Sequence, residues 1–324
     1  MSIASTVDLV AAEMAQVEAR LAGVASVEYP LLGELLKHLL DTRGKRLRPL
    51  VLILSARLFR EASPAVVDAA AAIELLHTAT LVHDDLVDRS TVRRGRPTLN
   101  SLKSGGVTVL VGDYMFAQAA GLAAATRNPD VVSVFARSLR VICEGELRQI
   151  DTRGDWRQSL DDYYYKIGCK TAALFAAAAE IGAILGRASK SERQRLHDFG
   201  YDLGLAFQIV DDLLDFVGDE RELGKPVGSD LRQGTLTLPV LHLLRSDPES
   251  PAIRAVVDLD GDDGRDEAIE AAVDTVVASG AIQSAHSEAV ERVGLAKSRL
   301  DDYPPTPIRA ALLELADYVT ARRF

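Results

Sequence analysis

The chain of 324 residues contains only two cysteines, Cys143 and Cys169. They do not form a Cys-x-x-Cys pair, so neither a thiolate zinc site nor a disulfide framework is indicated. Free cysteines are most often small buried residues, and we expect that role for both. A reducing compartment fits this pattern, and we expect the protein to be cytoplasmic.

Positive charge and long apolar runs are also in short supply. Lys and Arg number 37 against 47 Asp and Glu, and the formal net charge is −10. Nucleic acids and anionic membranes attract basic surfaces, so we expect neither as the main partner. No uninterrupted run reaches the roughly 18–20 apolar residues that a membrane span needs. The first 21 residues lack the basic segment of a signal peptide.

Aromatic residues are few, at 5%, whereas the helix formers Ala and Leu recur throughout. Apolar residues follow helical spacing in six segments, which are residues 66–82, 107–124, 131–150, 171–186, 194–217 and 308–320. Pro49 suits the first turn of a further helix. The breaks between these segments do not separate regions of different composition. We therefore expect a single all-α domain that spans residues 1–324.

Two DDxxD motifs stand out against this helical background. In each motif the first and last Asp lie one helical turn apart on one face, with the second Asp beside them. The six residues are Asp84, Asp85, Asp88, Asp211, Asp212 and Asp215. One short motif of this kind is equally compatible with a solvated helix face, but two copies within apolar segments favour a site on each helix.

Carboxylates held this close repel one another, and a hard divalent cation relieves the repulsion. Magnesium prefers oxygen ligands and combines a few carboxylates with substrate phosphates. Neither motif supplies the Cys or paired His ligands that are typical of zinc. The sequence therefore predicts magnesium bound together with a phosphate-containing substrate.

Basic and polar residues flank both Asp clusters, as a polyphosphate substrate requires. These residues are Lys45, Arg48, Arg93, Arg94, Lys170 and Lys225. We expect Lys170 and Thr171 to begin an Ala-rich helix whose N-terminus helps to bind the anion. His77, two turns before Asp84, is interpreted as a diphosphate donor, although a packed core histidine is the alternative. Gln208 either orients a substrate or satisfies a buried contact.

These residues lie within a dense set of motifs. They are GKRLRP (44–49), LLHTATLVHDDLVDRSTVRRGRPT (75–98), GDYMFAQA (112–119), EGEL (144–147), KTAALF (170–175), FQIVDDLLD (207–215) and GKPVGSDLRQGTLTLP (224–239). In these motifs the chain resembles the trans-isoprenyl diphosphate synthases, also called polyprenyl synthetases. The resemblance covers residues 44–239. It implies an all-α isoprenoid-synthase bundle around a central cavity, a homodimer, and three magnesium ions that bridge the two motifs to an allylic diphosphate.

The resemblance also implies roles for individual residues. Direct metal ligands would be Asp84, Asp88 and Asp211, supported by Asp85, Asp212 and Asp215. The allylic diphosphate would be held by Arg93, Lys170 and Lys225, and isopentenyl diphosphate by Lys45, Arg48, His77 and Arg94. Thr171 and Gln208 would stabilise an allylic carbocation. One position departs from the family pattern, because Thr235 stands where many relatives have Lys.

The reaction implied is a 1′-4 head-to-tail condensation of isopentenyl diphosphate with the ionised allylic diphosphate, after which the released diphosphate takes the proton. No general base is then required. Transient membrane contact during product release is left open.

Product length in this family depends on side chains about one turn before the first motif. Ala79 and Thr80 occupy that position and are small, which predicts a polyprenyl product longer than geranylgeranyl diphosphate. Tyr114, Phe116 or Phe135 are alternative floors for the tunnel. Farnesyl or geranylgeranyl diphosphate is therefore the alternative product.

Two rival functions were weighed against condensation. A terpene cyclase or head-to-head synthase also ionises a diphosphate. The chain, however, carries two sets of basic residues, one for each of two diphosphate substrates, which favours condensation. A regulatory subunit of a heteromeric synthase would tend to have lost Asp or basic positions, and here both clusters are intact.

Overall fold

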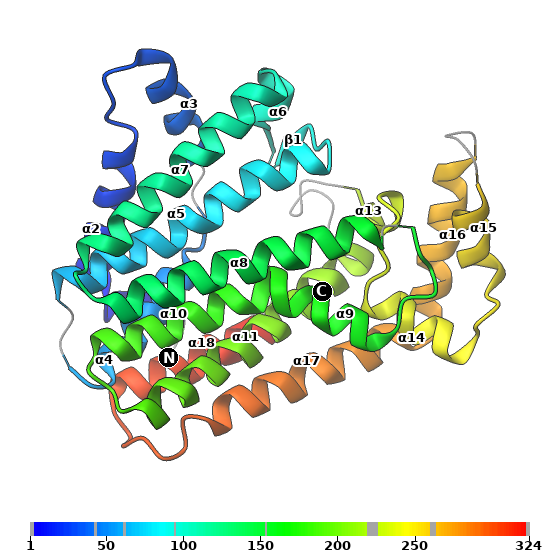
Figure 1. Ribbon diagram of the computed structural model, residues 1–324. Helices are drawn as coiled ribbons and strands as arrows, with labels where there is room; N and C mark the ends of the chain where they lie inside the picture. The colour runs from blue at the N-terminus through cyan, green and yellow to red at the C-terminus, as the bar shows by residue number, and fades with distance from the viewer. Residues whose placement is uncertain are drawn as a thin grey trace. The chain divides into compact units, whose positions relative to one another are not determined.

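The computed structural model describes residues 3–41, 44–60, 63–93, 95–152, 154–218, 226–259 and 264–321. Nearly all of these residues lie in helices, as Figure 1 shows. The only strands in the described part are β1 (Val92–Arg93) and β2 (Arg96–Pro97), which pair as a short antiparallel ribbon. The prediction of an all-α fold is confirmed.

The chain divides into two compact units by its internal contacts. The first comprises residues 1–140, 173–201 and 297–315, and the second comprises 141–172, 202–296 and 316–324. Each unit is therefore assembled from segments far apart in the sequence. That the whole chain works as a single domain stays a prediction.

The first unit contains whole helices from the N-terminal part of the chain, together with one that follows residue 172. In chain order these are α1 (Ile3–Asp8), α2 (Ala11–Val24), α3 (Pro30–Leu40), α4 (Leu47–Arg57), α5 (Pro64–Val87), α6 (Leu99–Leu102), α7 (Gly105–Ala125) and α10 (Ala173–Leu185). The unit also includes the first parts of α8 (Pro129–Asp151), α11 (Lys190–Val217) and α18 (Pro307–Thr320). Pro49 lies in the first turn of α4, as predicted.

The second unit contains helices from residue 160 onward that are not part of the first unit. They are α9 (Leu160–Ile167), the π-helical turn η1 (Gly168–Ala172), α13 (Ser229–Arg232), α14 (Leu238–Ser246), α15 (Pro251–Asp258), α16 (Arg265–Ala278) and most of α17 (Ala281–Ser298). The remainders of α8, α11 and α18 complete the unit. The second Asp motif lies near the end of α11.

Helix α5 is the centre of the first unit and packs against α2, α4, α7 and α10. Its alanines pack closely, because small side chains let neighbouring helices approach, and Ala79 is fully buried. In Figure 1, α5 and α7 run side by side. This packing fixes the helix that carries the first Asp motif.

The two cysteines differ in their surroundings. Cys169 is buried, as expected, but Cys143 is exposed on α8. The expectation that both are buried is therefore wrong for Cys143, because the sequence does not show which side of α8 faces outward. Both are free thiols.

Three helical stretches are long and apolar enough, by mean hydropathy, to cross a membrane: Pro64–Val87, Gly105–Ala125 and Leu160–Leu185. The sequence prediction counted only uninterrupted apolar runs. In the first and third stretches, 67% and 83% of the most apolar window is buried, so the core of each unit accounts for those apolar residues. The window in α7 is only 33% buried.

The contact between α4 and α10 depends on a glycine. A Cβ atom added to Gly182 would lie 2.3 Å from the carbonyl oxygen of Leu52 and 2.7 Å from the Cβ of Ser55. The first atom is part of the backbone of α4 and the second is attached directly to it. Neither can move away from the added Cβ unless the two helices separate. The backbones of α4 and α10 therefore approach each other closely at Gly182.

Replacing Gly182 by Ala is expected to lower the free energy of unfolding by about 1–3 kcal/mol, because the added methyl overpacks the α4–α10 contact. The matched control is Gly294→Ala on α17, where nothing lies within 4 Å of the added Cβ. There Ala should stabilise the helix by up to about 1 kcal/mol. Urea denaturation measures both, and equal effects of the two substitutions would contradict the close approach.

Candidate functional site

The first Asp motif occupies the last turn of α5. Asp85 is buried, and one of its carboxylate oxygens accepts a hydrogen bond of 2.7 Å from Nε of Arg93 on β1. Asp84 and Asp88 are half-buried. The three carboxylates thus differ, because the inner one is paired with a cation of the protein while the outer two are partly open to solvent.

The pKa of Asp85 reflects the burial of this carboxylate and the charges beside it. Burial is the largest cause that raises the pKa of Asp85 above its usual value, and the charges of Asp84 and Asp88 raise it further. The Arg93 guanidinium acts in the opposite direction. A further cation near the outer carboxylates would relieve the remaining repulsion.

The second Asp motif on α11 also has a buried inner residue. One carboxylate oxygen of Asp212 accepts from the Tyr163 hydroxyl at 2.7 Å, and the other accepts from Nε2 of Gln208 at 2.8 Å. Burial, with a smaller contribution from the charge of Asp230, raises the pKa of Asp212 to about 7. The two hydrogen bonds favour the ionised form and limit this rise.

Gln208 satisfies a buried contact and also connects two predicted site residues. Its Oε1 accepts a hydrogen bond of 2.6 Å from the Thr171 hydroxyl, while its amide donates to Asp212. The chain Thr171–Gln208–Asp212–Tyr163 links η1, α11 and α9. Of the two roles considered for Gln208, the buried contact is observed, and substrate orientation stays a prediction.

The third Asp of this motif fixes the loop that follows. The Asp215 carboxylate accepts from Ser229 Oγ at 2.9 Å and from the backbone N–H of Asp230 at 3.0 Å. Residues 226–237, which we call the α13 loop, are thereby attached to α11. Asp211 is half-buried. The second motif therefore shares with the first a half-buried first Asp and a buried second Asp, but its third Asp is buried as well.

Lys170 and Thr171 do not begin a helix, which corrects the sequence prediction. The helix starts ten residues earlier, where Ser159 forms a capping box with Asp162, and it continues through η1 into α10. The N–H groups at Lys170 are therefore inside a helix and provide no N-terminal anion site. Lys170 instead forms an ion pair of 2.7 Å with Glu146. A single-turn π-helix of this kind often marks a functional position.

The basic segment before α4 separates into exposed and buried residues. Lys45 is exposed, whereas Arg48 is buried with its guanidinium 4.6 Å from the ring centre of Phe175. Arg46 is also buried and bridges Glu18 at 2.7 Å and Glu74 at 3.0 Å. Its φ of 49° is strained for a residue other than Gly, and the ion pairs hold it in place.

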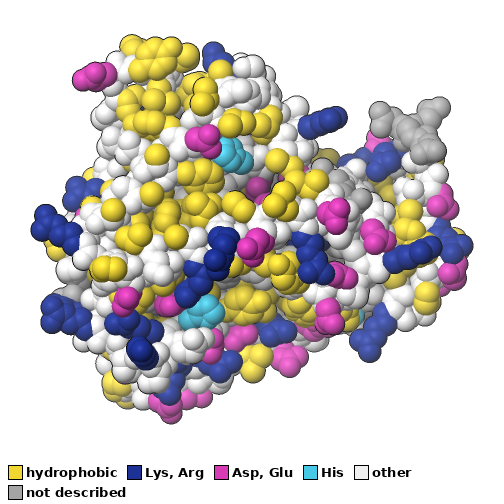
Figure 2. All heavy atoms as spheres, in the orientation of Figure 1, with side chains coloured by type: hydrophobic (Ala, Val, Ile, Leu, Met, Phe, Trp, Pro, Cys, Tyr) yellow, Lys and Arg dark blue, Asp and Glu magenta, His cyan; other side chains and the backbone are white. Residues whose placement is uncertain are grey.

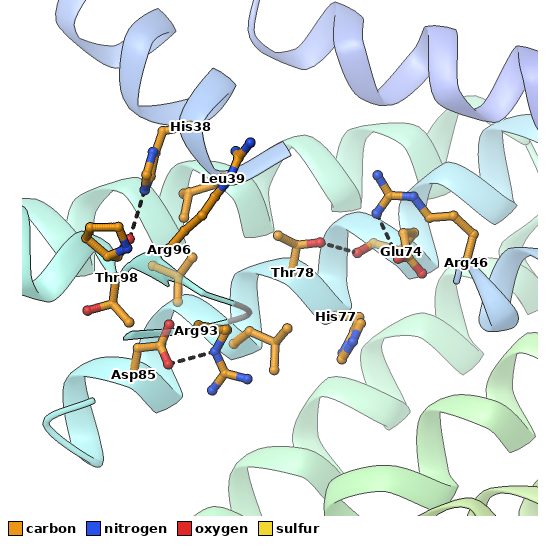
Figure 3. Close-up of a pocket in the computed structure, with 13 residues that line it drawn as sticks. His38, Leu39, Arg46, Glu74, His77, Thr78, Asp85, Arg93, Arg96 and Thr98 are labelled. Carbon is orange, nitrogen blue, oxygen red and sulfur yellow. Dashed lines mark hydrogen bonds and ion pairs between the residues drawn. The ribbon is translucent and has the colours of Figure 1, made fainter. Parts of the chain in front are cut away.

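A pocket of about 70 Å³ lies between α3, α5 and the β1–β2 ribbon (Figure 3). Its lining includes both charged groups, the Arg46–Glu74 pair and the Asp85–Arg93 pair, together with half-buried His77. His77 thus lines a pocket near the first motif rather than lying in the apolar core, and its role as a diphosphate donor stays a prediction. Arg94 and Lys225, which the sequence also assigned to the site, lie outside the described residues.

The two clusters fit magnesium. Among the described residues, no three His, Cys, Asp or Glu side chains are arranged to hold a metal ion by themselves. Magnesium suits such a site, because it accepts one or two carboxylates and takes its other ligands from water and substrate phosphate. The more open carboxylates Asp84, Asp88 and Asp211 are the ones that offer oxygens.

Comparison with known proteins agrees with the resemblance. The model of the polyprenyl synthetase family matches residues 29–276. The chain belongs to this family. It is 37% identical, over 96% of both chains, to "Heptaprenyl diphosphate synthase component 2" of Geobacillus stearothermophilus. We therefore describe the protein as an enzyme, a polyprenyl diphosphate synthase.

Solved structures give the same result. A decaprenyl diphosphate synthase from Rhodobacter capsulatus matches with a TM-score of 0.91 and 39% identity, over 99% of both chains. A polyprenyl synthase from Caulobacter crescentus CB15, complexed with calcium and isoprenyl diphosphate, matches with a TM-score of 0.94 and 37% identity, over 100% of this chain and 98% of that one. The isoprenoid-synthase fold of this synthase is thus confirmed.

Several site residues were not found from the sequence. Tyr163 and Ser229 hold the buried carboxylates of Asp212 and Asp215, but nothing in the neighbouring sequence signals that role. Glu74 and Arg46 were detectable in principle, since an acidic residue within the apolar run of α5 needs a buried cation. Lys166, one turn before Lys170, lies near the second motif.

Removing the Tyr163 hydroxyl with Tyr163→Phe leaves the packing of the ring in place but removes one donor to Asp212. The pKa of Asp212 should rise further, so less of it is ionised at neutral pH. Activity at pH 7 should fall about 10–100-fold, as is typical when a residue that supports a metal ligand is lost, and the acidic limb of the pH–rate profile should move to higher pH. Tyr165→Phe, on the exposed side of the same helix, is the control. An unshifted profile for Tyr163→Phe would contradict this role.

Proposed function

We propose that this synthase condenses isopentenyl diphosphate with an allylic diphosphate, in a 1′-4 head-to-tail reaction that needs magnesium. The observation that carries the proposal is the same arrangement at both motifs. In each, an inner Asp is buried and bound to protein donors, while the first Asp is more open. The first Asp of each motif is thus accessible to cations bound together with a diphosphate.

The residues of the site take the following roles in this proposal. Direct metal ligands are Asp84, Asp88 and Asp211, with Asp85, Asp212 and Asp215 holding the surrounding groups. The allylic diphosphate is bound by Arg93, Lys170 and Lys225, and isopentenyl diphosphate by Lys45, Arg48, His77 and Arg94. The Arg48 and Arg93 positions support these roles, because neighbouring groups already fix both guanidinium groups.

Charge stabilisation is the main contribution of the protein to the reaction. Magnesium, for which we propose three ions, supplies Lewis-acid stabilisation of the departing diphosphate when it is bound. Lys170 and Arg93 add positive charge to the leaving group. The Thr171 and Gln208 oxygens, which a hydrogen bond holds together, would stabilise the electron-deficient allylic carbon. The released diphosphate then accepts the proton, so no side chain is needed as a base.

We propose a product longer than geranylgeranyl diphosphate. Ala79 is small and fully buried, and the Thr80 hydroxyl is bonded to the backbone carbonyl of His77, so neither places bulk before Asp84. The related heptaprenyl and decaprenyl synthases support this proposal. A farnesyl or geranylgeranyl product, with a floor elsewhere, is the alternative.

We further propose a cytoplasmic homodimer in which α7 forms part of the interface. Val109 and Leu110 are exposed on α7, Leu110 to 70%, and Leu102 just before it is 50% exposed. Figure 2 shows hydrophobic side chains gathered over the part of this face where α7 lies. An exposed apolar helix face of this extent suits a subunit interface. A heteromeric partner is the alternative, since the Geobacillus relative is named as a component.

The reaction is tested by incubating the purified chain with farnesyl diphosphate and isopentenyl diphosphate. We expect chain extension that requires both isopentenyl diphosphate and magnesium, with a product longer than geranylgeranyl. Turnover of the allylic substrate alone would favour a cyclase. Inactivity of the pure chain, restored by a partner protein, would favour a subunit of a heteromeric synthase.

The position of the tunnel is tested with Ala79→Leu and Ala79→Phe. If the growing chain passes Ala79, the larger side chains should shorten the product in the order of their size. Circular dichroism and thermal melting check that each variant is folded. A folded Ala79→Phe protein with an unchanged product would place the tunnel floor elsewhere.

The interface is tested with Leu110→Glu. A charge in the apolar contact should convert a dimer to a monomer in analytical ultracentrifugation. Val290→Glu, at an exposed position on α17, should leave the assembly unchanged. A dimer that survives Leu110→Glu would exclude this part of α7, and flotation of the wild type with anionic or neutral vesicles would assign the exposed face to a membrane instead.

A further inference from the structure

Lys166 is a partly buried cation that none of the assigned roles uses. It lies one helical turn before Lys170, in the last turn of α9 where the π-helical turn begins. Its ammonium is 5.8 Å from the ring centre of Tyr163, the residue that holds Asp212. Lys166 therefore belongs to the immediate surroundings of the second Asp motif, although it is not part of any motif.

The charges around Lys166 are mostly negative. Burial, the largest effect, lowers the pKa of Lys166, and the neighbouring charge of Lys170 lowers it further. Asp212 and Asp230 act in the opposite direction and favour the charged ammonium. These acidic neighbours favour the charged form of Lys166, which is the form that binds an anion.

The ammonium of Lys166 has donors to spare. Among the described residues it makes one hydrogen bond, of 3.2 Å, to the backbone carbonyl of Leu236. A lysine ammonium carries three N–H donors, so two remain for another acceptor. A diphosphate offers several anionic oxygens to such a group.

The bond to Leu236 brings Lys166 to the end of the α13 loop. In this loop, the N–H of Thr235 donates to the carbonyl of Asp230 at 2.9 Å, and Asp230 is attached to Asp215 of the second motif. Arg232 is the only basic residue in the loop, and its side chain is paired with Asp266 on α16. Thr235 itself offers only a hydroxyl. Lys166 on α9 thus brings an ammonium to the end of this loop.

We propose that Lys166 binds the diphosphate of the allylic substrate at the α13 loop, where Arg232 is already paired with Asp266. The inference rests on the proposed function and adds a substrate-binding residue to it. The charge reaches the loop from a neighbouring helix, so its source is not visible in the loop sequence. A lysine placed at position 235 would put an ammonium in the same loop, next to the residue that Lys166 contacts.

The experiment measures diphosphate binding separately from turnover. Isothermal titration calorimetry with inorganic diphosphate and magnesium is carried out on the wild type and on Lys166→Met, which keeps the length of the side chain without its charge. Loss of a hydrogen bond to a charged group corresponds to about a 10–100-fold weaker Kd. The KM for farnesyl diphosphate should rise in parallel, while the KM for isopentenyl diphosphate changes little. Lys190→Met, at an exposed position on α11, is the matched control and should behave as the wild type.

The decisive variant is the double substitution Lys166→Met with Thr235→Lys. If charge at the loop is what matters, the second lysine should recover most of the lost diphosphate affinity. A purely structural role of Lys166, as the anchor of Leu236, predicts lower thermal stability of Lys166→Met and no recovery, because Lys at 235 does not restore that bond.

The outcomes separate the two proposals. If the wild type binds diphosphate and turns over but Lys166→Met binds equally well, the Lys166 inference is overturned and the proposed function stands. If Lys166→Met is folded and weak but the double variant stays weak, the charge is not what the loop needs, and the inference is again overturned. A wild type that neither binds diphosphate nor condenses the two substrates would overturn the proposed function and, with it, the inference.

Discussion

The repulsion between carboxylates one helical turn apart is the constraint on which the site depends. Each DDxxD motif places three negative charges within a short stretch of helix, and one of them is buried in the first motif and two in the second. Burial makes each charge harder to ionise, as the raised pKa values of Asp85 and Asp212 record. Cations and hydrogen-bond donors from other parts of the chain offset the free-energy cost of burying these carboxylates.

Each buried carboxylate binds a different neighbouring group. Asp85 positions Arg93. Asp212 positions the Tyr163 hydroxyl and the Gln208 amide. Asp215 positions the start of the α13 loop. The buried carboxylates Asp85, Asp212 and Asp215 therefore organise the site, while the other three are half-exposed. Since magnesium takes only part of its ligands from protein, a site of this kind is completed by its substrate. Specificity for a diphosphate and affinity for the metal then depend on each other.

The basic residues near the site also differ in their roles. Arg46, between Lys45 and the buried Arg48, has a strained backbone conformation. Its guanidinium is paired with Glu18 and Glu74. Basic residues that are adjacent in the sequence thus have different tasks, one structural and the others directed at ligands. Near the second motif, Lys166 illustrates the converse, a charge brought to a loop from a helix about 70 residues away in sequence.

The sequence by itself determined the all-α fold, the family and the two Asp motifs, because helical periodicity and short motifs are local properties of the chain. It also located the helices that carry the motifs. It could not show that Lys170 lies inside a continuous helix, since the start of that helix depends on the capping box at Ser159. Nor could it find Tyr163, Ser229 or the Arg46–Glu74 pair, whose partners are distant in the chain. Which carboxylate is buried, and what neutralises it, was decided only by tertiary structure, because burial and pairing depend on the packing of one helix against another.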